Sequence, residues 1–199
     1  ANAITGVISA WADSIPGLII SGQENLRFVK KYKKNKMRMW GIQGFDSVKM
    51  VKDVTKYSNR LNDPKKIFYE LDTCFYESLN SRPGPVWLDI PIDIQGSYIK
   101  NYKSLKRFKG KNKFKQIDKN LKNKIKKIIL SSKRPVIWLG NGVKISNCAG
   151  LAHKFISKLN LPFFLSWSAI DVFDSTHKLN FGRPGVYGNR ASNIILQNS

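Results

Sequence analysis

The chain has few cysteines, few acidic residues and no long apolar run, and each shortage excludes a class of protein. Its 199 residues include only two cysteines, too few for a disulfide scaffold or a cysteine-rich metal site. No apolar run approaches the roughly 20 residues that span a bilayer. Neither a Gly-x-Ser-x-Gly motif nor a phosphate-binding P-loop motif is present. We therefore expect no membrane association, no serine-hydrolase elbow and no P-loop, and the cysteine content favours a reducing, cytoplasmic location.

Residues that often bind metals or catalyse are also scarce. The two histidines, His153 and His177, lack a second histidine or cysteine at ligand spacing, so we expect no zinc site and place His153 on a helix surface. Asp89 and Asp93 flank Pro91 at the end of a predicted strand. They are either a carboxylate pair or turn-capping residues, and the second interpretation is favoured.

Positive charge is abundant, but it is concentrated in two segments. The net charge is +22, from 35 lysines and arginines against 13 acidic residues. Residues 27–38 contribute +7 and residues 100–127 contribute +12, which leaves only +3 for the rest. Most of these cations are lysines, and arginine is the better residue for bidentate recognition of bases and phosphates. We therefore interpret both segments as solvated connectors and expect no specific nucleic-acid partner.

The remaining sequence is that of a folded α/β protein. Hydrophobic residues make up 42% and aromatic residues 12% of the chain, enough to bury a core. Apolar spacing predicts alternating helices and strands, and hence mostly parallel sheets covered by helices. The predicted helices cover residues 3–15, 45–51, 64–79, 117–129 and 147–159, with a last one from about residue 189; the predicted strands cover 18–22, 54–61, 86–91, 135–139 and 161–165.

Two of these helices receive more detailed predictions. In the helix that Asp63-Pro64 opens, the buried stripe is assigned to Ile67, Phe68, Leu71, Phe75 and Leu79. The helix before residue 160 is expected to begin with Ser146 as its N-cap and to bury Leu151, Phe155 and Leu159.

Glycine-bearing loops are the strongest local sign of a ligand site. Gly140-Asn141-Gly142 follows a predicted strand, and Gly182-Arg183-Pro184-Gly185 adds a cation to a second such loop. Glycine lets backbone N–H groups approach a phosphate closely, and open α/β sheets bind ligands at the carboxyl ends of their strands. Spacing alone leaves a dinucleotide-type site as one alternative among several.

A series of motifs resembles a known family. The series includes Asn2-Ala3-Ile4-Thr5-Gly6, Gly41-Ile42-Gln43, Arg82-Pro83-Gly84-Pro85-Val86-Trp87-Leu88-Asp89-Ile90-Pro91, Gly140-Asn141-Gly142, Ser166-Trp167 and Phe181-Gly182-Arg183-Pro184-Gly185. In this order they resemble thiamine-diphosphate-dependent enzymes of the acetolactate synthase type, across nearly the whole chain.

The resemblance implies two incomplete domains. Residues 1–97 are expected to be the C-terminal part of the pyrimidine-binding domain, 98–115 a basic linker, and 116–199 the N-terminal part of the central domain. The family's catalytic glutamate would precede Asn2, and its Gly-Asp-Gly segment, which binds Mg²⁺ and the diphosphate, would follow Ser199. The isolated chain is therefore expected to be inactive, and its parent to be an enzyme.

The resemblance also implies roles for individual residues. Gln43 matches a glutamine near cofactor and substrate, whose amide donates to developing negative charge. The next residue is Gly44, where the family usually has an acid. The residues that match cofactor-binding positions, several of them in an FAD groove, are Asn2, Arg82, Gly140, Gly142, Ser166, Trp167, Gly182 and Arg183.

The implied activity is decarboxylation of a 2-oxo acid and transfer of the resulting enamine to a second carbonyl. Thiamine diphosphate, Mg²⁺ and FAD are the implied cofactors, and a homodimer or homotetramer is the implied assembly. A related decarboxylase or C–C hydrolase is an alternative, because Gly44 departs from the pattern. A non-catalytic dinucleotide-binding module is the alternative from another class, and nucleic-acid binding through the basic segments is the third.

Overall fold

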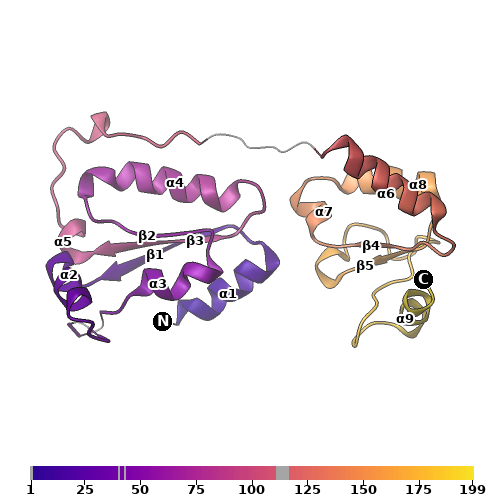
Figure 1. Cartoon of the computed structure of the whole chain (residues 1–199), viewed down its shortest axis with the longest axis horizontal. Coiled ribbons are helices and arrows are strands. Elements are labelled where there is room, and N and C mark those ends of the chain that lie inside the picture. The colour runs from indigo at the N-terminus through magenta and orange to yellow at the C-terminus, as the bar shows by residue number, and fades with distance from the viewer. Residues whose placement is uncertain (1, 40, 43, 111–116) are drawn as a thin grey trace. The chain divides into compact units, whose positions relative to one another are not determined.

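The chain folds into two compact units, the first ending at residue 114 and the second starting at residue 115. The computed structural model describes residues 2–39, 41–42, 44–110 and 117–199. In both units helices cover a parallel sheet (Figure 1). The α/β class that the sequence predicts is thus confirmed. Among the described residues, no helix is both long and apolar enough to cross a membrane.

The first unit is built on a three-stranded parallel sheet in the order β1-β3-β2. Strand β1 covers Gly17–Gln23, β2 covers Tyr57–Arg60 and the central strand β3 covers Pro85–Pro91. Helix α4 (Ile67–Leu79) covers one face, while α1 (Ala3–Asp13) and α3 (Ser47–Val51) cover the other (Figure 1). The remaining elements are α2 (Leu26–Lys34), α5 (Ile92–Gln95) and the 3₁₀ turns η1 (Lys52–Val54), η2 (Pro64–Lys66) and η3 (Tyr102–Ser104).

The first unit has one core on each side of its sheet. Because β3 is central and covered on both faces, its side chains are almost all buried, as is usual for a parallel sheet. One core holds Val7, Val51 and Trp87, and the other holds Cys74, Val86 and Leu88. The alternation of β3 side chains between the two faces therefore joins the helices of both layers to the sheet.

The second unit is built on two parallel strands, β4 (Ile137–Leu139) and β5 (Phe163–Leu165). Its core gathers residues from α8 (Ala149–Leu159), β5 and the turns that follow. The buried members are Ala152, Ile156, Phe163, Leu165, Ala169, Val172 and Phe173. The other elements are α6 (Lys119–Ser131), α7 (Gly142–Ile145), the 3₁₀ turn η4 (Trp167–Ala169) and α9 (Arg190–Gln197).

The first basic segment is a helix and not a connector, so that prediction is wrong. Residues 26–34 form α2, with Leu26 and Val29 buried on its inner side. The backbone N–H of Leu26 donates to the Asp93 carboxylate at 3.0 Å, which satisfies one of the free donors at the start of the helix. Leu26 and Val29 are three residues apart, which is helical spacing, and they anchor the segment. The many lysines around them made this pattern inconspicuous in the sequence. Asp93 therefore caps the start of α2, whereas the sequence favoured a turn-capping role for it.

The apolar stripes predicted for two helices are only partly right: in α4 the predicted Ile67 and Leu71 do pack against the core. In α4 the buried residues include Cys74 and Ser78, whereas Phe75 and Leu79 are more than half exposed. In α8 the buried residues are Ala152 and Ile156, and the predicted Leu151 and Phe155 are exposed. Several of the buried positions carry small side chains (Cys74, Ser78 and Ala152), so a prediction based on hydrophobicity selected larger neighbouring residues.

The N-cap prediction for Ser146 is also wrong. Residues 142–145 form the short helix α7, and Ser146 lies at its end, where its hydroxyl donates to the carbonyl of Gly142 at 2.7 Å. Cys148 precedes α8, without a side-chain cap. The sequence did not indicate α7, because it begins at Gly142 and glycine is a poor helix former.

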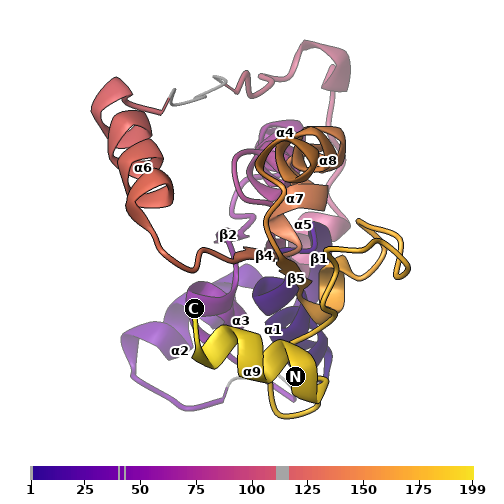
Figure 2. The same cartoon turned by 90° about the vertical axis from the view of Figure 1, so that its right-hand side faces the viewer.

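Helix α6 forms near the predicted residues, but it buries none of them. Its apolar residues Leu121, Ile125 and Ile128 are about half exposed. Figure 2 shows α6 standing apart from α8 and the strands of its own unit.

Residues 106–110 pack onto α4, and we call them the docked segment. Arg107 forms two hydrogen bonds of 2.6 Å with Asp72. The Phe108 ring meets Tyr69 and Tyr76 edge-on, with centroids 5.5 and 5.3 Å away. The start of the second basic segment is therefore anchored on the first unit.

Candidate functional site

Three loops meet at the carboxyl edge of the β4–β5 sheet. The N–H of Ser166 donates to Leu139 at 2.9 Å, and the N–H of Leu165 donates to Gly182 at 2.9 Å. These bonds bring the loop after β4, the loop after β5 and the loop at 181–185 to one edge. Such an edge is where open α/β sheets bind ligands.

Most of the predicted cofactor residues of the second unit gather at this edge. The Arg183 guanidinium lies over the Trp167 indole, 4.3 Å from the ring centroid. Gly140 faces Ser166, because a Cβ at Gly140 would lie 4.0 Å from the Ser166 hydroxyl. Gly142 begins α7 two residues further on and is exposed.

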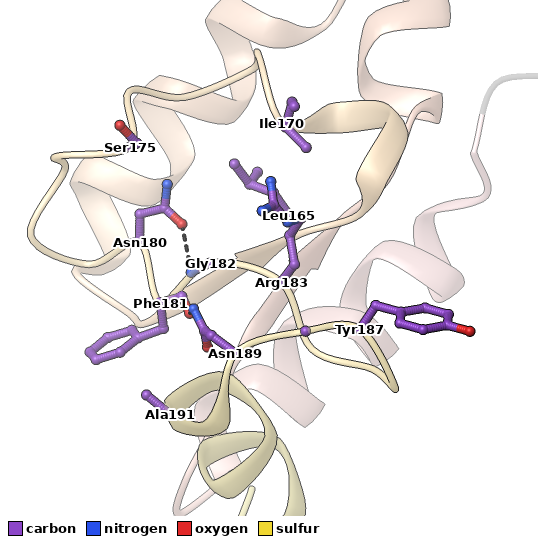
Figure 3. Close-up of a pocket in the computed structure, with 11 residues that line it drawn as sticks. Leu165, Ile170, Ser175, Asn180, Phe181, Gly182, Arg183, Tyr187, Asn189 and Ala191 are labelled. Carbon is purple, nitrogen blue, oxygen red and sulfur yellow. Dashed lines mark hydrogen bonds between the residues drawn. The ribbon is translucent and has the colours of Figure 1, made fainter.

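A cavity of about 570 Å³ opens beside Arg183. Figure 3 shows the side chains that line it, with Tyr187 pointing away from the others. The lining is mixed, with one cation, two side-chain amides and several apolar side chains. The residues are Leu165, Ile170, Ser175, Asn180, Phe181, Gly182, Arg183, Tyr187, Gly188, Asn189 and Ala191.

Hydrogen bonds hold the rim of this cavity. Gly182 has φ +85° and donates its N–H to the Asn180 side chain at 2.9 Å. The Asn189 amide donates to the carbonyl of Phe181 at 3.1 Å and accepts from the N–H of Ser192 at 2.8 Å. Asn189 thus caps α9 and ties it to the glycine loop. A Cβ on Gly182 would overlap this amide, so glycine is required there.

Arg183 gives the cavity its positive charge. Its guanidinium makes no hydrogen bond to any described residue, so its donors are available to a ligand. A guanidinium stacked on an indole keeps its edge donors free for phosphate oxygens. Nearby, Lys144 donates to Asp171 at 2.9 Å and holds the pKa of that carboxyl below its usual value. Asp171 therefore stays ionised and paired with Lys144.

In the first unit the two predicted cofactor residues lie apart. Asn2 precedes α1 without a side-chain capping bond, whereas Arg82 donates to the hydroxyl of Ser14, just after α1, at 2.6 Å. They are separated by the 11 residues of α1, about 16 Å of helix. The structure does not bring Asn2 and Arg82 to one point.

Arg82 borders a smaller cavity of about 350 Å³ with Trp11 and Lys56. Burial is the main reason that the pKa of Lys56 is lowered, and Glu77 acts in the opposite direction. The Lys56 ammonium donates to the carbonyl of Asn80. Sequence reasoning did not single out Lys56, since a lone lysine before a strand carries no recognisable pattern.

The carboxyl edge of the first sheet carries a buried polar network that the sequence did not reveal. Asp89 is fully buried in β3 and accepts from Ser21 in β1 at 2.7 Å and from Arg60 in β2 at 2.6 Å. Ser21 and Arg60 are the register partners of Asp89 on its two sides. Asp89 is thus one side of a buried ion pair and neither a turn cap nor paired with Asp93. Gln43, the predicted catalytic residue, lies outside the described residues.

No cluster of three or more histidine, cysteine, aspartate or glutamate side chains occurs in the part of the chain that the structure describes. His153 lies on the surface of α8, as predicted, and stacks on Phe173 with ring centroids 3.9 Å apart. Its ring nitrogen is 2.6 Å from the carbonyl of Val172. It therefore has a structural role in the second unit.

Comparison with known proteins now identifies the relatives of the chain. Residues 123–199 match the model of the thiamine pyrophosphate enzyme central domain. The acetolactate synthase large subunit of Haemophilus influenzae is 29% identical over the whole chain, which covers 34% of that protein. That of Lactococcus lactis is 27% identical over 98% of the chain and 33% of its own length, and isozyme 3 of Escherichia coli is 27% identical over 100% and 34%.

The chain therefore spans about a third of the length of the curated relatives that it matches. The resemblance described from its motifs is confirmed: along its whole length the chain is similar to acetolactate synthase large subunits, and residues 123–199 match the central domain of thiamine pyrophosphate enzymes.

Proposed function

We propose that the chain is part of a thiamine diphosphate-dependent carboligase or lyase that acts on 2-oxo acids and resembles acetolactate synthase. The observation that carries this proposal is similarity to acetolactate synthase large subunits over 94–100% of the chain in several organisms. The match of residues 123–199 to the central domain supports it independently. The proposed reaction is decarboxylation of a 2-oxo acid followed by transfer to a second carbonyl.

The domain assignment follows from the same likeness. We assign residues 1–97 to the pyrimidine-binding domain, 98–115 to the connection and 116–199 to the central domain. The division of the chain into compact units near residue 114 is compatible with this assignment. Residues 106–110, which fall within the proposed connection, contact α4 through Arg107 and Phe108.

The cavity beside Arg183 is proposed as a site for the diphosphate and sugar part of FAD. Its features suit such a group: a guanidinium with free donors, side-chain amides and a glycine loop at a strand edge. Arg183 would bind phosphate oxygens, and the exposed edge of Trp167 would cover an apolar portion. Gly140, Gly142 and Ser166 would border the same group.

The described residues do not provide a Mg²⁺ site, because they hold no carboxylate cluster. We therefore assign neither Mg²⁺ nor the diphosphate of thiamine diphosphate to a described side chain. Bound thiamine diphosphate supplies the electron sink for decarboxylation. The contribution proposed for this chain is the Gln43 amide, which would donate a hydrogen bond to the substrate carboxylate or a developing alkoxide.

Location and assembly remain parts of the proposal. We propose a homodimer or homotetramer in the cytoplasm, with a small 2-oxo acid as substrate and without specific nucleic-acid binding.

Turnover of pyruvate by the protein expressed from its complete reading frame tests this function. We expect release of CO₂ that requires thiamine diphosphate and Mg²⁺, with an acetoin- or acetolactate-type product. Release of an aldehyde alone would favour the related decarboxylase, and cleavage of a diketone would favour the C–C hydrolase. Tight FAD or NAD binding without turnover of any 2-oxo acid would contradict the proposal and favour the non-catalytic dinucleotide module.

FAD binding is tested separately by quenching of flavin fluorescence. Arg183→Gln removes the phosphate-binding cation and is expected to weaken FAD binding at least tenfold, since a charge-assisted hydrogen bond is lost. Arg190→Gln, on the exposed first turn of α9, is the matched control. If both variants and the unsubstituted protein bound FAD with equal affinity, the proposal that FAD binds in this cavity would be contradicted.

A further inference from the structure

The end of the first basic segment and α3 line a second cavity, to which the proposed function assigns no ligand. This cavity has a volume of about 620 Å³, and all of its described lining residues belong to the first unit. Four of these residues are cations, two from the loop after α2 and two from α3 and η1. The lining residues are Lys36, Met37, Arg38, Asp46, Val48, Lys49, Lys52 and Ser58. We call this space the basic cavity.

Helical spacing forms one wall of the basic cavity. Val48 and Lys49 lie in α3, and Lys52 begins η1 directly after it. Lys52 is three residues from Lys49 and four from Val48, so the three side chains lie on one face. The hydroxyl of Ser58, in β2, donates to the carbonyl of Val48 at 3.4 Å. The backbone that carries both lysines is therefore attached to the sheet.

Residues 36–38 form another wall, and the chain on both sides of them is held in place. Before them, the N–H of Asn35 donates to a carbonyl in the last turn of α2 at 3.1 Å. After them, the N–H of Ile42 donates to the Glu24 carboxylate at 3.1 Å. Lys36 has φ +54°, a left-handed conformation that turns the chain at the end of the helix. These contacts place Lys36 and Arg38 on a defined turn beside α3.

The described residues do not balance the positive charge of the basic cavity. Asp46 is the single acid in its described lining, and the Asp46 carboxylate accepts from the Arg60 guanidinium at 3.1 Å. None of the four cations forms an ion pair with a residue that the structure describes. Like charges three residues apart on a helix repel each other, so Lys49 and Lys52 destabilise α3 and η1. An anion bound in the cavity would remove this repulsion.

The lining of the basic cavity suits a phosphorylated small molecule. An arginine guanidinium offers paired donors to two oxygens of one phosphate, and lysine ammonium groups bind phosphate oxygens as point charges. A single phosphate group carries about two negative charges, fewer than the four cations here. Met37 and Val48 add apolar surface, and ligand sites typically have volumes of roughly 300–1,000 Å³. We propose that the basic cavity binds a small molecule with two or more phosphate groups, such as a nucleoside diphosphate.

Isothermal titration calorimetry with ADP and with inorganic diphosphate tests this site. The protein expressed from its complete reading frame is first saturated with thiamine diphosphate, Mg²⁺ and FAD, so that the cofactor sites of the proposed function are filled. We expect one saturable site per chain for ADP and for diphosphate. Inorganic phosphate is expected to bind at least tenfold more weakly, because it contacts fewer of the four cations.

A pair of double variants separates the basic cavity from the general charge of the protein. Lys49→Gln with Lys52→Gln removes two cations of the lining, and both side chains are exposed, so the fold is expected to tolerate the change. Lys30→Gln with Lys31→Gln is the matched control, because these exposed lysines lie in α2, outside the lining, and the net charge changes equally. We expect the first pair to weaken ADP binding at least tenfold, since two charge-assisted contacts are lost, and the control pair to weaken it less than twofold.

Four other results would overturn the proposal. Equal weakening by both double variants would show only general attraction between a basic protein and an anion. The absence of saturable binding of ADP and diphosphate would exclude the site, and equally tight binding of inorganic phosphate would exclude a ligand with several phosphate groups. A lower affinity of the cavity variant for thiamine diphosphate would assign the cavity to that cofactor and not to a further ligand. Turnover of pyruvate does not enter the titration, so the proposed function stands or fails separately.

Discussion

At the scale of single residues, the rim of the Arg183 cavity depends on a glycine that no other residue replaces easily. Gly182 has φ +85°, and its missing side chain leaves space for the Asn189 amide. That amide both caps α9 and holds the carbonyl of Phe181. One backbone position therefore links the loop geometry to the stability of the following helix.

We predict that Gly182→Ala lowers the free energy of unfolding of the second unit by about 1–3 kcal/mol, because it adds left-handed strain and displaces a helix cap. Urea unfolding measures the change. Gly150→Ala is the control: Gly150 lies in α8 with open space around it, so alanine is expected to be neutral or to stabilise by up to about 1 kcal/mol. Equal stabilities of the two variants would contradict the assigned role of Gly182.

The individual residues also show what a sequence can and cannot reveal. Gly182 and Arg183 were predictable, because glycine and a cation after a strand form a local pattern. Asp89 was noticed, but its partners Ser21 and Arg60 are 68 and 29 residues away, and only strand register brings them together. Lys56 acquires its lowered pKa from burial, which no local pattern encodes.

At the scale of elements, the docked segment and α4 form an interface of aromatic rings and one ion pair. Phe108 contacts Tyr69 and Tyr76, and Arg107 lies over the Phe68 ring at 5.1 Å. Gly110 lies directly against Tyr76, where a Cβ would overlap the ring. The docked segment thus partly covers three aromatic residues of α4, namely Phe68, Tyr69 and Tyr76.

We predict that Phe108→Ala releases the docked segment and speeds tryptic cleavage after Lys106, Arg107 and Lys109 about tenfold. Two edge-on aromatic contacts are lost, each worth about 0.5–1.5 kcal/mol, and proteolysis follows the population of the open state. Tyr98→Ala is the control, because the Tyr98 side chain is 92% exposed. Equal cleavage rates for the two variants would show that the ring contacts do not hold the segment.

Acid is predicted to release the docked segment by another route. The hydrogen bonds from Arg107 are the main reason that the pKa of Asp72 lies below its usual value. The stabilisation is therefore present above the unfolded-state pKa, about 3.9, and is lost as the pH falls through the lower folded-state pKa. Hydrogen exchange of the Phe108 N–H, which donates to Asp72, measures the release.

In Asp72→Asn the Phe108 N–H is expected to exchange faster already at neutral pH, without the additional acid-dependent increase. The amides of β3 serve as the internal reference, since they report on unfolding of the whole unit. Acid release that is identical in the variant and the unsubstituted protein would assign the effect to another group.

Whole elements were easier to predict than their orientation. The alternation of helices and strands was evident from apolar spacing, and α4 and β3 lie close to the predicted residues. The buried face of α4 was predicted only in part: Ile67 and Leu71 pack against the core, but Cys74 and Ser78 are buried further along the helix while the larger Phe75 and Leu79 remain exposed. Helix α2 was missed because its charges outnumber the two residues that anchor it.

At the scale of the whole molecule, each unit has its own core. The residues around Ile156 belong to the second unit, and those around Val51 and Leu88 belong to the first. The sequence indicated two regions through the basic stretch between them. It did not indicate that part of this stretch docks on the first unit, because that contact depends on ring positions along α4.

We predict that Ile156→Ala lowers the stability of the second unit alone, by about 2–5 kcal/mol, because the fully buried side chain leaves a cavity. Hydrogen exchange resolved by peptide measures each unit separately. Leu121→Ala, on the exposed α6, is the control and is expected to change stability by less than about 0.5 kcal/mol. Equal loss of protection in both units after Ile156→Ala would show that they unfold as one.

The strand order of the first unit also has a consequence for how the protein is made. The central strand β3 is the last of the three in the chain, so β1 and β2 have no partner among the described strands until it is synthesised. At 5–20 residues per second, the ribosome needs roughly 3–14 s to travel from the end of β1 to the end of β3. During this interval the backbone N–H and C=O groups of β1 lack their strand partner, and we expect the nascent chain to bind chaperones that shield such unpaired strands.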